Sequence, residues 1–266
     1  MKYKQLLSNI ILSFKSNISI LFKYYLFPEQ FNYISQMIKP IYLFSDSQLL
    51  FWKEDGHLFI SRLLEDLGPL KNVEHVNAAY IGASNGDISD FFEIFLAAMA
   101  QLNVSSCRLI PSKPTKADLE FLNAADLILL AGGEVRLGWE VMKENGVAEI
   151  IRSKRQEGVT LLGISAGAIQ LGLFGMDQET TFDTFQFAPF IIDAHDEAND
   201  WERLSTIVTT HQGISGYGIP FGGGLVYHPD GTIEAVRNSL VELISAEDSF
   251  KKSVIRPHQL PGSAPF

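Results

Sequence analysis

The sequence predicts an α/β fold in which a mostly parallel sheet is sandwiched between helices. Short runs of consecutive apolar residues alternate with longer amphipathic stretches over most of the chain. Strands that are apolar throughout are typical of a sheet covered on both faces, and intervening helices connect such strands in parallel. Small polar or glycine-rich loops follow three of these runs, at 82–87, 132–133 and 165. They mark the carboxyl edge of the sheet, where ligands bind in such folds.

The first part of this domain is predicted to alternate strictly between the two kinds of element. Strands are expected at 41–44, 77–82, 106–110, 126–130 and in the run that leads to Ser165. Helices are expected at 58–67, 89–102, 116–123, 134–144 and 147–156. In 89–102, apolar side chains recur at helical spacing along one face. Pro111 and Pro114 break the chain before the next helix.

The later part of the chain is expected to add a small antiparallel edge. An apolar run at 187–192 and a helix at 201–209 precede two short strands, 225–227 and 233–236. The sequence Pro229-Asp230-Gly231 supplies the turn of a hairpin between those strands. We assign the main domain to 40–248. Residues 249–266 are rich in Pro, Lys and Ser, and we expect a flexible tail there.

Residues 1–39 differ from this domain in charge. They carry several lysines and a single acid, Glu29, and their apolar residues recur at helical spacing. Lys15 and Lys23 interrupt the apolar run too early for a membrane-spanning helix, and no signal-peptide cleavage site follows. We expect an amphipathic helical extension. It packs on the domain or on a second subunit of a homodimer, or it lies on an anionic membrane surface.

Composition and charge exclude several classes of function. The chain has 266 residues and a net charge of −10, which argues against nucleic acid as a partner. Its one cysteine, Cys107, rules out internal disulfides and suits the reducing cytoplasm. No Cys/His cluster has the spacing of a metal site, so we expect neither a metal nor another cofactor.

The segment 158–172 is the strongest indication of catalysis. It combines an apolar strand, the pattern Gly163-Ile164-Ser165-Ala166-Gly167 and the start of a helix. This is the construction of a nucleophile elbow, in which a sharp turn holds the serine hydroxyl above the sheet. The helix start would direct N–H groups toward a developing oxyanion. The alternative is that Ser165 only caps the helix.

A serine nucleophile needs a base within hydrogen-bond reach. His195 follows an apolar strand at the edge from which Ser165 also emerges, so we favour it over His211. The other histidines lie in or beside polar loops or in the Pro-Asp-Gly turn. The alternative for both His195 and His211 is a structural role without any part in catalysis.

The segment Gly163-Ile164-Ser165-Ala166-Gly167-Ala168 resembles the Gly-x-Ser-Ala-Gly-Ala motif of the S51 family of serine peptidases, which includes aspartyl dipeptidase (peptidase E) and cyanophycinase. The segments 130–137, 190–195 and 218–220 resemble further motifs of the family, in the same order. The resemblance covers about 41–244. It implies a flavodoxin-like fold similar to class I glutamine amidotransferases, with serine in place of their cysteine.

The resemblance also implies roles for individual residues. Ser165 would attack the scissile carbonyl, and His195 would take its proton and return it to the leaving amine. The backbone N–H groups of Gly133 and Ala166 would form the oxyanion hole. The acid that orients the histidine is expected to be Asp177, with Glu179 and Asp183 as alternatives. Where cyanophycinase-like members have a glutamate, this chain has Phe221.

Three residues are expected to contact the substrate. Glu134 stands where the family has Asn or Asp, and Asp200 stands near the position of an arginine that grips the substrate's aspartate. Arg203 matches a later arginine. An acid at 200 would favour a basic side chain or a free amine over an acidic side chain.

These observations predict a cytoplasmic serine peptidase that cleaves dipeptides or short peptides, including isoaspartyl-linked ones. One alternative is a catalytically silent relative that binds a peptide or an amino acid. Another is an amide-transferring or deglycase-type enzyme of the same fold. A thiol mechanism is disfavoured, because Cys107 lies on a different strand from Ser165.

Overall fold

The computed structural model describes residues 39–68, 72–177, 180–246 and 249–258. The basic extension expected at 1–39, with its proposed contacts to a membrane or a second subunit, lies outside the described residues except for Lys39. Residues 259–266 of the expected tail also lie outside them.

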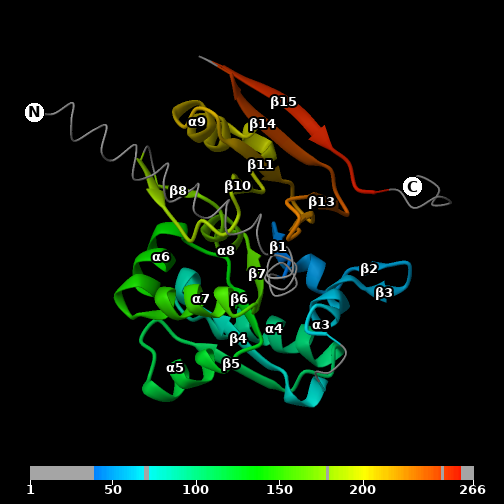
Figure 1. The fold of residues 1–266 in the computed structure, drawn as a ribbon, viewed down its shortest axis with the longest axis vertical. Coiled ribbons are helices and arrows are strands. Elements are labelled where there is room, and N and C mark those ends of the chain that lie inside the picture. Colours follow the sequence, from blue (N-terminus) through cyan, green and yellow to red (C-terminus); the bar gives the residue numbers. More distant parts are fainter. Residues whose placement is uncertain (1–38, 69–71, 178–179, 247–248, 259–266) are drawn as a thin grey trace, which may run out of the picture. The chain divides into compact units, whose positions relative to one another are not determined.

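A seven-stranded sheet forms the centre of the domain, in the order β13-β12-β1-β7-β6-β4-β5 (Figure 1). Its strands are β1 (Ile41–Phe44), β4 (Asn77–Ile81), β5 (Ser106–Ile110), β6 (Leu127–Leu130), β7 (Thr160–Ile164), β12 (Gly224–Tyr227) and β13 (Ile233–Val236). Five neighbouring strands of this sheet, β1, β7, β6, β4 and β5, are parallel. The strands β12 and β13 form an antiparallel hairpin, and β12 pairs antiparallel with β1. The mostly parallel sheet and its small antiparallel edge are therefore confirmed.

Helices cover both faces of this sheet. The α-helices are α3 (Arg62–Glu65), α4 (Ser89–Gln101), α5 (Lys116–Asn123), α6 (Val135–Glu144), α7 (Val147–Gln156), α8 (Ala166–Leu171) and α9 (Glu202–Thr210). Short 3₁₀ turns are η1 (Ser47–Leu50), η2 (Phe59–Ser61), η3 (Val73–His75), η4 (Ala83–Asn85) and η5 (Glu197–Asn199). The helix expected at 58–67 is shorter than predicted, since it consists of η2 and α3.

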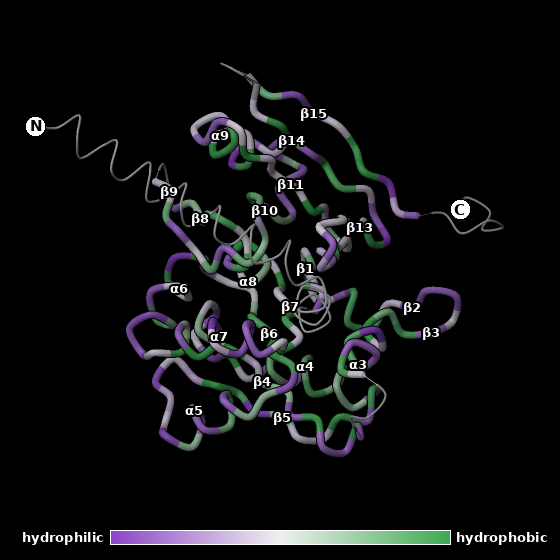
Figure 2. Tube along the Cα trace, viewed as in Figure 1, coloured by the Kyte–Doolittle hydropathy of each residue, from purple (hydrophilic) through white to green (hydrophobic). Residues whose placement is uncertain are grey.

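Alternate residues of the same strands enter two separate cores, as the period of a β-strand requires. Leu43 and Leu130 pack in one core with Trp139 of α6 and Ile151 of α7. On the other face, Phe44, Leu129 and Leu162 pack in a core with residues of α3 and α4. Figure 2 shows these central strands as largely hydrophobic and the outer turns of the helices as hydrophilic.

The structure contains a second sheet, which the sequence did not predict. Its four strands have the order β10-β11-β14-β15. It contains β10 (Ile191–Ala194), β11 (Ser215–Ile219), β14 (Leu240–Ala246) and β15 (Ser249–Ile255). Its own apolar cluster joins Ile191 and Leu243 of the sheet to Trp201 and to α9. Figure 1 shows it above the large sheet, in yellow to red. Its position matters because His195 follows β10.

The prediction of a flexible tail from residue 249 is wrong for residues 249–255. Residues 249–255 form β15, which pairs antiparallel with β14 from Leu240↔Ile255 to Ala246↔Ser249. Lys251 and Lys252 are exposed there. Lysines are common on edge strands because they discourage pairing with another chain. A polar composition therefore does not distinguish such a strand from a tail.

Two small hairpins complete the fold. They are β2 (Lys53–Glu54) with β3 (His57–Leu58) and β8 (Phe174–Asp177) with β9 (Thr180–Asp183). None of the helices in the described part of the chain has the length and hydrophobicity needed to cross a membrane.

Candidate active site

Ser165 lies at the apex of a sharp turn between β7 and α8. Its backbone has φ = +50° and ψ = −112°, a conformation that costs free energy in a residue with a side chain. A Cβ atom on Gly163 would lie 2.6 Å from the backbone of Gly167, and one on Gly167 would lie 2.1 Å from the Leu130 carbonyl oxygen. Only glycine fits either position. The Ser165 side chain makes no capping hydrogen bond to α8, so the turn is that of a nucleophile elbow.

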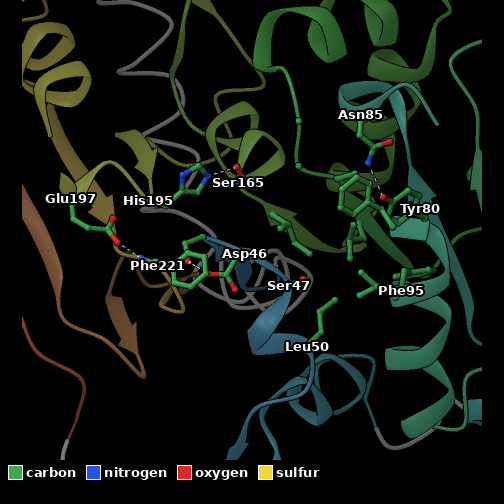
Figure 3. A pocket seen from close by; sticks show the side chains of 18 of the residues that line it. Asp46, Ser47, Leu50, Tyr80, Asn85, Phe95, Ser165, His195, Glu197 and Phe221 are labelled. Atoms are coloured by element: carbon green, nitrogen blue, oxygen red, sulfur yellow. Dashed lines mark hydrogen bonds between the residues drawn. The ribbon is translucent and has the colours of Figure 1, made fainter. Parts of the chain in front are cut away.

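His195 approaches this serine from the second sheet. It follows β10, has φ = +45°, and donates its backbone N–H to the Ile219 carbonyl at 2.9 Å. Its Nε2 atom lies 2.8 Å from Ser165 Oγ, and Figure 3 shows the two side chains facing each other. A histidine nitrogen at this distance can accept the hydroxyl proton.

His211, the other candidate base, is engaged elsewhere. Its Nδ1 atom is 3.0 Å from the Ile207 carbonyl oxygen, and its ring stacks on Phe174 with 4.1 Å between centroids. It does not line the cavity at Ser165.

The two residues expected to form the oxyanion hole, Gly133 and Ala166, lie beside the serine. A Cβ atom on Gly132 would be 3.3 Å from Ser165 Cβ. Gly133 has φ = +134°, and a Cβ atom there would overlap the Ser84 carbonyl. Ala166 is the first residue of α8, so its N–H has no acceptor within the helix. Gly133 and Ala166 are thus both placed beside the nucleophile.

A buried glutamine fixes the loop that contains Gly132 and Gly133, and the sequence gave no reason to single it out. Gln170 is fully buried in α8, and its Nε2 donates to Ser84 Oγ at 3.0 Å and to the Val135 carbonyl at 2.8 Å. Glu134 donates its backbone N–H to the Ser84 carbonyl at 2.7 Å. Glu134 does not line the cavity, so its expected contact with substrate has no support in this geometry.

The structure does not bring the expected orienting acid to the histidine. Asp177 lies at the end of β8, where its carboxylate accepts from Arg136 Nε at 2.8 Å. Asp183 accepts from Gln186 at 3.2 Å, and Glu179 lies outside the described residues. Within the described ranges, no hydrogen bond joins His195 to a carboxylate.

Buried charges surround the histidine turn instead. Asp193 and Asp196 are both buried, and Arg203 reaches them at 2.8 Å and 3.8 Å respectively. Burial raises the pKa of Asp193 to about 6, and Asp196 adds to this rise while Arg203 opposes it. Arg203 was expected to contact substrate, but it pairs with the turn that carries His195. Asp200, also expected there, is exposed and pairs with Lys252.

A cavity of about 500 Å³ opens at Ser165 and His195. Much of its lining is aliphatic or aromatic, and it includes Leu50, Tyr80, Phe91, Ile94, Phe95, Leu129, Ile164 and Phe221 (Figure 3). Asp46 and Glu197 also line it, and they accept the backbone N–H groups of Gly222 and Phe221 respectively. No lysine or arginine of the described chain lines the cavity. The described residues contain no group of His, Cys, Asp and Glu side chains that could hold a metal.

A strained serine after a parallel strand, with a histidine nitrogen in reach, is the arrangement that serine hydrolases use. The chain belongs to peptidase family S51, whose family model matches residues 62–235. The resemblance inferred from the motifs is therefore confirmed.

Two curated proteins share part of this sequence. The uncharacterized peptidase YgaJ of Bacillus subtilis is 32% identical over 97 residues, which are 36% of this chain and 42% of YgaJ. The pyridoxal 5'-phosphate synthase subunit PdxT of Thermococcus gammatolerans is 33% identical over 86 residues, 32% of this chain and 41% of PdxT. The chain thus spans about two fifths of the length of these relatives.

Two solved structures share the fold. A peptidase from an acI-B1 Actinobacterium aligns with a TM-score of 0.53 and 14% identity, over 82% of this chain and 97% of its own. A Listeria monocytogenes protein assigned to peptidase E aligns with a TM-score of 0.56 and 18% identity, over 75% and 98%. At these identities the likeness concerns the fold alone.

Proposed function

We propose that this protein is a serine peptidase that hydrolyses dipeptides or short peptides, with Ser165 as nucleophile and His195 as base. The observation that carries the proposal is the 2.8 Å contact between Ser165 Oγ and His195 Nε2 at the apex of a strained turn. Membership of family S51 supports the same reaction class.

The proposed reaction has two halves. Ser165 Oγ attacks the scissile carbonyl carbon while His195 Nε2 takes the hydroxyl proton, and that proton then passes to the leaving amine. Water attacks the resulting ester with His195 again as base, which releases the acid product and restores the serine. The N–H groups of Gly133 and Ala166 are the proposed donors to the oxyanion, and one such donor is worth roughly 3–4 kcal/mol in other enzymes.

The base acts in this proposal without an orienting carboxylate. The backbone of His195 is fixed by its hydrogen bond to Ile219 and by the buried charges on either side of it. In a serine protease whose orienting aspartate was replaced by asparagine, kcat fell by about 10⁴. We therefore expect a slower enzyme than one with a complete triad.

The test is covalent labelling with a fluorophosphonate, followed by mass spectrometry of the modified peptide. Wild-type protein should be labelled at Ser165. Ser165→Ala should lose the label, and His195→Ala should slow labelling by roughly 10³-fold or more. His211→Ala is the matched control and should label at the wild-type rate. Labelling that survives in His195→Ala would remove His195 from the role of base.

The alternative is a catalytically silent relative that binds a peptide or an amino acid. It is favoured by the ion pair of Asp177 with Arg136 and by Phe221 at the position where cyanophycinase-like members have a glutamate. This alternative predicts no labelling of folded wild-type protein, together with peptide binding that is equal in wild type and Ser165→Ala.

A further inference from the structure

The far end of the cavity beside Ser165 is largely apolar, and its polar groups are Asn85 and the Tyr80 hydroxyl, which accepts from Asn85 Nδ2 at 2.9 Å (Figure 3). Tyr80, Phe95 and Leu129 are 3%, 1% and 0% exposed, and all three line the cavity. The rings of Tyr80 and Phe95 are 5.5 Å apart, and Phe92 packs against both. Neighbouring rings therefore hold this end in place, and a ligand would meet a preformed apolar surface.

The rim of the cavity is also aromatic. Phe91 of α4 and Phe221 are 48% and 58% exposed, and both side chains line the opening. Large apolar side chains left in water around a cavity are typical of a surface that a ligand covers. Phe221 is held there because Asp46 and Glu197 accept the N–H groups of Gly222 and Phe221.

The charges of the cavity oppose an acidic ligand. Its charged carboxylates are Asp46 and Glu197, and no lysine or arginine within the described ranges lines it. A carboxylate transferred from water into this space would lose its hydration without gaining a cation. It would also meet two groups of its own sign. Acidic residues, and the free carboxylate of isoaspartyl-linked peptides, therefore fit it poorly.

We propose that this cavity binds an aromatic or large aliphatic side chain of the substrate, next to the scissile bond, and selects against acidic side chains. Its volume of about 500 Å³ lies in the range that holds small-molecule ligands. The far end between Tyr80, Phe95 and Leu129 takes the apolar side chain. At the near end, Gly132 and Gly133 have no side chains, so they leave room for the scissile carbonyl of the substrate beside Ser165. This specificity rests on the proposed peptidase function.

Binding of dipeptides to Ser165→Ala protein tests the specificity without turnover. Calorimetry compares Phe-Ala, Leu-Ala, Asp-Ala and Lys-Ala, and also the reversed set from Ala-Phe to Ala-Lys. The tightest aromatic or leucine peptide should bind at least tenfold more tightly than its Asp counterpart. Equal or tighter binding of an Asp or Lys peptide, or no binding in the whole set, would overturn the proposal.

Two variants of one exposed residue sharpen this test. In the Ser165→Ala background, Phe91→Lys should reduce the preference for Phe over Asp tenfold or more, because it places a cation at the rim. Phe91→Ala should weaken binding of the Phe peptide by about threefold or more and leave binding of the Asp peptide unchanged. Leu96→Ala is the matched control, because Leu96 is an exposed apolar residue of the same helix that does not line the cavity. A preference that survives Phe91→Lys unchanged contradicts the proposal.

The outcome is independent of the labelling experiment. Wild-type protein labelled at Ser165 whose inactive variant prefers acidic peptides would keep the peptidase function and lose the apolar specificity. Unlabelled protein that still prefers aromatic peptides would keep the apolar cavity and lose the catalytic role.

Discussion

The two residues of the proposed catalytic pair both have a positive φ, but different contacts support the two turns. Ser165 follows β7 of the large sheet with φ = +50°, and His195 follows β10 of the small sheet with φ = +45°. Each is a strained residue that neighbouring structure must hold in place. What differs is the physical origin of the support.

The serine turn is held by close packing of uncharged atoms. Gly163 and Gly167 let β7, α8 and the end of β6 approach closely, and the Ser165 N–H donates to the Phe44 carbonyl at 2.8 Å. The histidine turn lies between Asp193 and Asp196, with Arg203 as their cation. The comparison predicts that pH changes how strongly the histidine turn is stabilised and has no such effect on the serine turn.

The largest effect is expected where the serine turn is packed most closely. Gly167→Ala adds a Cβ atom 2.1 Å from the Leu130 carbonyl oxygen, and neither backbone can move without disturbing α8 or β6. We expect a loss of more than about 4 kcal/mol in the free energy of unfolding, measured in denaturant. Gly231→Ala is the control. It has open space and φ = +88°, so it should cost only about 1–2 kcal/mol. Equal losses would show that packing does not hold the serine turn.

On the histidine turn, the charge of Asp193 should make stability depend on pH. The pKa of Asp193 is about 6 in the folded protein, against an ordinary value of 3.8. Between these values the folded state keeps a proton that the unfolded state has released, so stability falls as pH rises. The Asp193→Asn variant has no ionisable group at this position, so it lacks this contribution to the pH dependence. The stability of wild type relative to this variant should therefore fall by about 2.4 kcal/mol from pH 4 to pH 7, which is most of the roughly 3 kcal/mol that a shift of about two pKa units represents.

Asp118→Asn provides a control of opposite sign. Hydrogen bonds from Thr115 lower the pKa of Asp118, so the stability of wild type relative to this variant should rise over the acidic range. Denaturation curves at several pH values measure both differences. Parallel pH profiles for wild type and Asp193→Asn would remove the electrostatic distinction between the two turns.

Removal of the cation should give a smaller effect with a related pH dependence. Arg203→Gln leaves Asp193 and Asp196 unpaired, but the Arg203 side chain is 48% exposed and solvent screens part of its charge. We expect a loss of about 2 kcal/mol at pH 8 and a smaller loss at pH 5, where Asp193 is mostly protonated. Lys116→Gln, which breaks the exposed pair with Glu120, should cost below about 0.5 kcal/mol at both pH values. A larger loss at pH 5 than at pH 8 contradicts this account of the turn.

The serine turn was predictable from sequence, and the histidine turn only in part. Glycines at fixed distances from Ser165 and an unbroken apolar run are local features, so they specify the strand, the turn and the helix together. In the second sheet, β10, β11 and β14 are well separated in sequence, whereas β15 pairs with its neighbour in the chain, β14. Its last strand, β15, pairs through its backbone while its lysines are exposed. Composition alone therefore suggested a tail.

The orienting acid was mispredicted because spacing does not fix the direction of a side chain. Asp177 lies on a hairpin that turns it toward Arg136. Phe95 belongs to the apolar helix face that the sequence predicts at 89–102, whereas Phe91 does not. The place of both side chains in a cavity beside Ser165 depends on how α4 packs on the sheet, which no local pattern shows. A signal for Asp193 and Asp196 did exist, since two acids flank His195 closely in the sequence.

The smallest effect is expected from the thiol, and it tests whether the serine turn carries the reacting group. Cys107 lies on β5, the edge strand of the large sheet, and its Sγ donates to the Val104 carbonyl at 3.7 Å. Burial raises the pKa of this thiol to about 11, so at pH 7.5 only about one molecule in 10³ or fewer carries the reactive thiolate. Cys107→Ser, or iodoacetamide at pH 7.5, should leave the rate of fluorophosphonate labelling at Ser165 unchanged. Inactivation by iodoacetamide that Cys107→Ser prevents would favour the thiol chemistry of an amide-transferring enzyme, and the comparison of the two turns would then concern the wrong nucleophile.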